Sequence, residues 1–145
     1  MGFRFSLDAL LQVKENRVEA LKRELAVLKR ALADERERLE GYREERKRYM
    51  EELEEKQREG ILPAEVLWYE GFISDLADKI HWHRKRVEEL ERSIEEKRQE
   101  LVVASQQKRI LERLKEKRWA EFIRELDRKE RAFLDEIGVR RNSFL

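Results

Sequence analysis

The chain contains no cysteine, and this absence excludes several kinds of chemistry. Disulfide bonds, thiolate nucleophiles and cysteine-ligated zinc sites all need that side chain. A chain without cysteine also fits a reducing compartment, so we expect a cytoplasmic protein.

Proline, glycine and long apolar runs are scarce as well. The 145 residues include 1 proline and 5 scattered glycines, so there is no glycine-rich loop to hold a phosphate. No run reaches the roughly 20 apolar residues that a membrane span needs. Arg4, Asp8 and Lys14 interrupt the N-terminal segment, where a signal peptide would have its apolar core. We therefore expect neither direct membrane insertion nor a signal peptide.

An excess of charge of one sign is also missing. The sequence has 34 basic and 33 acidic residues, which does not favour a nucleic-acid partner. What the chain does have is a very high charged fraction, 46%, in a background rich in Glu, Lys, Arg and Leu. This composition is typical of long helices and coiled coils.

Apolar residues in the first third of the chain follow a 4-3 spacing over about six heptads, which predicts a coiled-coil helix. Ten of the 13 positions are apolar or Tyr, and the whole series is Leu11, Lys14, Val18, Leu21, Leu25, Leu28, Leu32, Glu35, Leu39, Tyr42, Arg46, Tyr49 and Leu53. Ser6 is the expected N-cap. We expect Glu35, Arg46 and a later polar position, Lys97, to extend outward from this seam.

A corner follows at "REGILPAEV". Gly60 can take the left-handed conformation that ends a helix, and Pro63 suits the first position of the next helix. A second 4-3 series then begins. Its positions are Ile73, Leu76, Ile80, His83, Val87, Leu90, Ile94, Lys97, Leu101, Ala104, Lys108 and Leu111.

Both series stay in phase when the chain folds back on itself, with the numbers of facing residues adding up to about 122. A slip of one heptad would preserve the phase. We therefore predict an all-α fold of two long helices in an antiparallel coiled-coil hairpin over residues 1–145, with the second helix longer. The expected bounds are about 6–58 and 63–138, with a turn at about 59–63 and a tail at 139–145. Lys14 opposite Lys108 is a predicted weak spot.

In this register the second helix extends beyond the first by roughly 25–30 Å. The extension carries Trp119, Phe122, Ile123, Leu126, Phe133, Leu134 and Ile137, and Gly138 is its expected stop. Two interpretations stay open for this apolar stripe. It packs on a second copy, or on the first helix in another register, or it docks into another protein as an amphipathic helix.

Aromatic residues gather near the corner, where we expect Trp68, Tyr69, Phe72 and Trp82 to cluster with Tyr42 and Tyr49. A two-helix seam cannot bury them all, so Phe72 should be partly exposed. Such a cluster indicates a binding surface, the alternative being that it shields the loop end.

Residues suited to catalysis or metal binding are not arranged for it. His81 and His83 point about 200° apart on a helix and cannot share an ion. The carboxylates have no pocket that would shift a pKa. We expect no catalytic, cofactor-binding or metal-binding residues, no cofactor and no enzymatic activity.

The opening "FRFSLDALLQVKENRVEALKRELA" and the closing "LERLKEKRWAEFIRELDRKERAFLDEIGVRR" resemble the flagellar FliJ family. The closing block carries the most specific part, "LKEKR" followed by "R…E…LDEI…R", whereas the final "RRNSFL" departs from the usual ending. The resemblance implies a two-helix coiled coil similar to the central stalk of rotary ATPases. It implies three kinds of partner: the hexameric flagellar export ATPase, the membrane export gate protein and export chaperones. It also implies a cytoplasmic location, peripheral at the cytoplasmic face of the inner membrane.

The resemblance further implies two contact surfaces. The ATPase ring would contact Leu7, Leu10, Trp119, Phe122, Leu126 and Phe133. The export gate would contact Leu39, Tyr42, Tyr49, Phe72, Leu76 and His83. Because Leu39, Tyr42, Leu76 and His83 also lie on the seam, only their edges would be available.

Three functions follow from these observations as hypotheses. The first is a non-enzymatic stalk and escort factor of flagellar type III export. The second is a structural coiled-coil spacer that self-associates through its C-terminal helix. The third, a nucleic-acid-associated coiled-coil arm, is disfavoured by the near-zero net charge.

Overall fold

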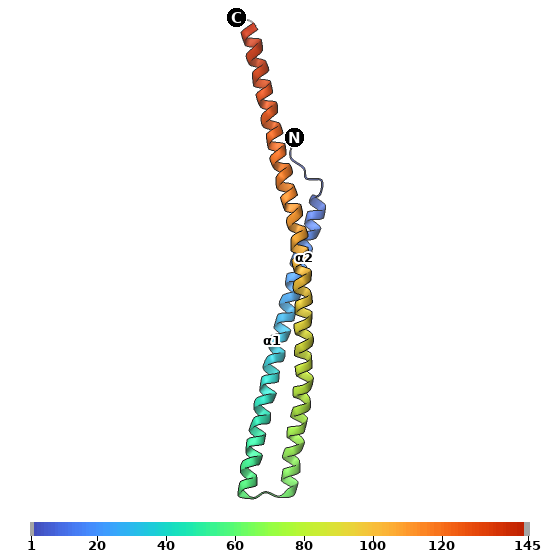
Figure 1. The fold of residues 1–145 in the computed structure, drawn as a ribbon, viewed down its shortest axis with the longest axis vertical. Helices are drawn as coiled ribbons and strands as arrows, with labels where there is room; N and C mark the ends of the chain where they lie inside the picture. Colours follow the sequence, from blue (N-terminus) through green and yellow to red (C-terminus); the bar gives the residue numbers. More distant parts are fainter. Residues whose placement is uncertain (1, 144–145) are drawn as a thin grey trace. The chain divides into compact units, whose positions relative to one another are not determined.

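The computed structural model describes residues 2–143, and these form two long helices without strands. Helix α1 spans Asp8–Glu59 and helix α2 spans Pro63–Ser143 (Figure 1). The second helix, with 81 residues against 52, is the longer one as predicted. The predicted all-α helical hairpin is confirmed.

The corner between the helices is formed as the sequence predicts. Gly60 has a φ of 101°, which places it in the left-handed region that favours glycine. Pro63 is the first residue of α2, where its missing N–H removes no helical hydrogen bond. These two residues stop one helix and start the next.

Two predicted helix ends are wrong. Ser6 is not the N-cap, because the first helical bond runs from the Leu11 N–H to the Leu7 carbonyl and α1 begins at Asp8. Gly138 does not stop α2, because it keeps a helical backbone and the helix continues to Ser143. An ion pair of 3.2 Å between Arg140 and Glu136 spans this glycine and supports the last turns. The predicted tail is therefore helical up to residue 143, and its last two residues lie outside the described part of the chain.

The chain divides into two compact units. Unit 1 comprises Met1–Ala20 with Leu101–Leu145, and unit 2 comprises Leu21–Glu100. In unit 1, Lys14 donates to Gln107 at 3.1 Å. In unit 2, Lys97 contacts Glu24 at 3.0 Å and Lys79 lies over the Tyr42 ring at 5.5 Å. The residue numbers of each pair add up to about 122, so each unit has the predicted antiparallel register.

The buried residues are mostly those of the two predicted series. Leu21, only 1% exposed, is the most deeply buried of them. The buried side chains are Leu11, Val18, Ala104 and Leu111 in unit 1, and Leu21, Leu25, Leu32, Leu39, Leu76, His83, Val87, Leu90 and Ile94 in unit 2. Phe5 and Tyr69 are also buried, although neither belongs to the two predicted series.

The three lysines at seam positions find partners. Lys14 and Lys108 avoid each other, because Lys14 bonds to Gln107 and Lys108 lies 3.8 Å from Glu112. The predicted weak spot is thus relieved. Hydrogen bonds to Glu24 and to Glu100 raise the pKa of Lys97.

Candidate functional site

The C-terminal part of α2 presents an apolar stripe that nothing covers. Every described residue from 123 to 142 is exposed, and in unit 1 this part of the helix continues past the N-terminal segment (Figure 1). We call its large side chains the C-terminal stripe: Ile123, Leu126, Phe133, Leu134 and Ile137. Their exposed fractions lie between 42% and 61%. Burial of each would be worth roughly 1.5–3 kcal/mol, so this surface favours association.

Charged residues around the stripe pair within α2. Arg128 bonds to Glu125 at 2.6 Å, and Arg131 bonds to Asp127 at 3.2 Å. The hydrogen bond from Arg128 lowers the pKa of Glu125. Since these pairs close within one helix, the charges leave the apolar stripe free for a partner.

Just before the C-terminal stripe, α2 contacts the segment that precedes α1. The Phe3 ring meets Trp119 edge-on at 5.2 Å and Phe122 at 5.5 Å between ring centroids. Phe5 is buried beneath the Arg118 guanidinium, which also donates to the Ser6 hydroxyl at 3.0 Å. We did not predict this contact from the sequence. The alternating apolar residues of "FRF" ahead of the helix were the available signal.

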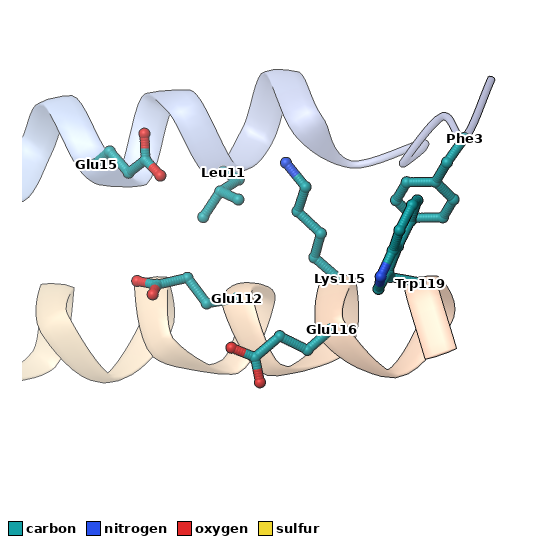
Figure 2. A pocket seen from close by; sticks show the side chains of 7 residues that line it. All are labelled: Phe3, Leu11, Glu15, Glu112, Lys115, Glu116 and Trp119. Atoms are coloured by element: carbon teal, nitrogen blue, oxygen red, sulfur yellow. The ribbon is translucent and has the colours of Figure 1, made fainter. Parts of the chain in front are cut away.

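A pocket of about 410 Å³ opens beside this contact in unit 1. Figure 2 shows Trp119 next to Phe3 at one end of it, with Leu11 and Glu15 on α1 opposite Glu112 and Glu116 on α2. Lys115 enters the pocket from α2 and bonds to Asp8 at 2.8 Å. The pocket combines an aromatic wall with an acidic rim, and it belongs to the same end of unit 1 as the stripe.

The residues predicted to contact the ATPase ring all lie in unit 1, in two environments. Leu126 and Phe133 are 48% and 61% exposed and belong to the C-terminal stripe. Trp119 is 47% exposed, and Phe122 is half-buried, both against Phe3. Leu7, just before α1, is half-buried, and Leu10, in the first turn of α1, is exposed. Their contact with a ring stays a prediction.

The aromatic residues near the corner form two clusters, not the single cluster that we predicted. In the first, Tyr49 stacks on Phe72 at 5.7 Å, and Trp68 and Tyr69 complete the group. In the second, His83 lies between Tyr42 at 5.2 Å and Trp82 at 4.7 Å. Phe72 is 40% exposed, as expected for a residue beside the seam. Two separate aromatic edges are therefore available in unit 2.

The residues predicted to contact the export gate are mostly inside the hairpin. Leu39, Leu76 and His83 are buried, and Tyr42 and Tyr49 are half-buried. Of the six, only Phe72 is clearly exposed, and it touches Tyr49. A gate contact through this face would involve mainly Phe72 and the edge of Tyr49. This contact stays a prediction.

His83 is buried in the seam and its ring Nδ1 lies 2.5 Å from a Glu35 carboxylate oxygen. This pair explains how Glu35 is tolerated at a seam position, where we had expected it to extend outward. His81, in contrast, is exposed. The two histidines do not converge, and residues 2–143 contain no group of three or more His, Asp or Glu side chains that could hold a metal ion.

No helix within the described residues is both long and apolar enough to cross a membrane. The candidate site on the hairpin consists of exposed apolar and aromatic surfaces. In unit 1 it consists of the C-terminal stripe and the pocket beside Trp119, and in unit 2 of the aromatic edges.

Comparisons with known proteins agree with this picture. The solved structure of a putative YscO homolog, CT670, from Chlamydia trachomatis is similar with a TM-score of 0.69 and 22% sequence identity. The match covers 94% of this chain and 93% of that chain, and it shows a shared fold. No curated protein matches the chain. The family described as "Flagellar FliJ protein" matches residues 3–143. Because that match spans nearly the whole sequence, the chain belongs to the flagellar FliJ protein family.

Proposed function

We propose that this chain is the stalk of the flagellar export ATPase ring and links that ring to the membrane export gate. Membership of the FliJ family makes it a component of the type III export apparatus. The finer assignment is supported chiefly by the C-terminal stripe, a helical surface with large apolar side chains and no partner within the described chain. An amphipathic helix of this kind binds by placing its apolar face in a groove of another protein.

Coupling to the ring would come from binding alone. A two-helix hairpin has no six-fold symmetry, so each subunit of a hexameric ring meets a different part of its surface. A subunit conformation that binds the local surface better becomes more populated, and this changes the balance of nucleotide states around the ring. No chemical step on the hairpin is needed, and we propose none.

The link to the gate would use unit 2. Phe72 with the edge of Tyr49 offers an exposed aromatic surface, and aromatic side chains are enriched in protein interfaces. We place the protein in the cytoplasm, at the inner face of the membrane that carries the gate. Binding of export chaperones belongs to the same proposal.

The test is to add the purified chain to its cognate ATPase and to measure hexamer formation and ATP turnover. We expect both to rise, and the rise to be smaller for Leu126→Ala/Phe133→Ala. Val27→Ala is the control, because it removes an exposed apolar side chain from unit 2. Binding of the chain without any change in turnover would remove the stalk function.

A second candidate function uses the same observation. The C-terminal stripe could pair with a second copy of itself and make the chain a structural spacer. Sedimentation equilibrium separates the two, because the spacer requires a stable dimer through α2, whereas the stalk is expected to be mostly monomeric.

A further inference from the structure

Four of the eight side chains that line a groove in unit 2 are basic. The groove has a volume of about 520 Å³ and lies between the two helices. Its lining comprises Arg43, Arg46, Lys47, Met50, Glu51 and Glu54 of α1, with Ile80 and Arg84 of α2. We call it the basic groove.

Most of the positive charge of this groove is not neutralised. Arg46, Lys47 and Arg84 form no ion pair with any residue of the described chain. Of the two acidic residues in the lining, Glu54 is already bonded to Arg58 at 3.0 Å. Elsewhere in the hairpin, charged residues commonly pair along or across the helices, as Arg36 does with Glu91 at 2.8 Å. The basic groove therefore offers its cations to an external anion.

Arg46 is the most informative residue of the lining. It occupies a seam position, and its Nε is buried without a hydrogen-bond partner among residues 2–143. A buried donor without a partner destabilises a fold, and an apolar side chain would suit this position better. A binding function would account for an arginine here.

We propose that the basic groove binds an acidic segment of a partner protein. Carboxylates of that segment bond to the guanidinium groups, whose planar fork matches a carboxylate in a bidentate way. An apolar side chain of the same segment packs on Met50, which is 47% exposed, and on Ile80. This apolar floor favours an amphipathic peptide over a free inorganic anion, and the flexible methionine adapts to its shape.

The lining of the basic groove shares no residue with the aromatic surface of Phe72 and Tyr49 that we propose for the export gate. Phe72 and Arg84 point about 120° apart around α2, by the 100° turn of each helical residue. The inference therefore goes beyond the proposed function. It can be tested on the isolated chain, whatever the ATPase and the gate do.

The experiment titrates the full chain into a fluorescent synthetic peptide of alternating glutamate and leucine and follows fluorescence anisotropy. We expect saturable binding that weakens with added salt and falls at least tenfold in Arg46→Gln/Arg84→Gln. The matched control is Lys85→Gln/Arg92→Gln, which removes two exposed charges outside the groove and should bind like the wild type. Equal loss in both variants would mean general charge attraction and would overturn the proposal.

Two further measurements sharpen the result. Arg46→Met should raise the melting temperature and lower peptide affinity, and unchanged affinity would overturn the proposal. Inorganic phosphate and phosphatidylserine vesicles are tested alongside, and binding of either without binding of the peptide would also overturn it. If the Arg46 variants do not fold, Arg84→Gln at its exposed position carries the same test, with Lys85→Gln as its control.

Discussion

The pair of His83 and Glu35 places two polar side chains between the helices of unit 2, where neighbouring seam positions are apolar. Their side chains are only 11% and 14% exposed, and they satisfy each other. A buried polar group costs free energy when its partner is removed, more than the pair contributes when both are present. Removal of one member of the pair should therefore lower the free energy of unfolding more than removal of both.

The substitution Glu35→Leu should lower the free energy of unfolding by about 1–3 kcal/mol, because it leaves the buried His83 ring without its partner. The double substitution Glu35→Leu/His83→Leu should recover most of this loss, since both positions then pack as apolar seam residues. Urea unfolding followed by circular dichroism measures both. A double variant as unstable as the single one would show that the pair is not the cause.

Because Phe3 contacts Trp119 and Phe122, the residues predicted to contact the ATPase ring should differ in their effect on stability. Trp119→Ala should lower the unfolding free energy by about 0.5–1.5 kcal/mol or more, because it removes an aromatic pair as well as buried area. Leu126→Ala/Phe133→Ala should leave it within about 0.5 kcal/mol, because these side chains are exposed. Thermal melting compares the two, and an equal loss in both would mean that the C-terminal stripe is packed after all.

At the scale of the helices, the corner that ends α1 depends on a single residue, Gly60. Gly60→Ala should destabilise the hairpin by about 1–2 kcal/mol, because an alanine pays for the left-handed backbone that glycine adopts freely. Gly71→Ala is the matched control: Gly71 lies inside α2 with open space where a Cβ would be added, and alanine should there stabilise the helix by about 0.5–1 kcal/mol. Chemical unfolding reads both effects, and the same sign for both would contradict this account of the corner.

The sequence predicts the helices well because the apolar spacing that indicates a helix is local and repeats along the chain. The 4-3 spacing indicates both helices, and two seams in phase indicate the register, which the contacts of Lys14 and Lys97 confirm. The helix ends were harder. Gly138 looks like a stop, yet glycine in a helix costs only about 1 kcal/mol and the surrounding turns continue.

The candidate site was less predictable, because it depends on contacts that no period encodes. Phe3 and Phe5 lie outside any helical repeat, so their packing on α2 could not be read from spacing. The basic groove depends on which charges remain unpaired, and this requires coordinates. The exposed C-terminal stripe was predictable, since it follows from the unequal lengths of the two helices.

At the scale of the whole molecule, the C-terminal stripe decides between a stalk and a self-associating spacer. We expect sedimentation equilibrium to give mostly monomer at micromolar concentration. The stripe is narrow and carries charged neighbours that already pair within α2. A stable dimer that Leu126→Ala/Phe133→Ala dissociates would instead favour the spacer.

The central claim is that the C-terminal stripe is the surface that enters the ATPase ring. Because the chain has no cysteine, a single Leu134→Cys variant can carry a photo-crosslinker at one defined place. Val27→Cys, at an exposed position in unit 2, is its control. We predict crosslinks to the ATPase from position 134 and none from position 27. Crosslinks from position 134 only to a second copy of the chain, or equal crosslinks to the ATPase from both positions, would contradict the account.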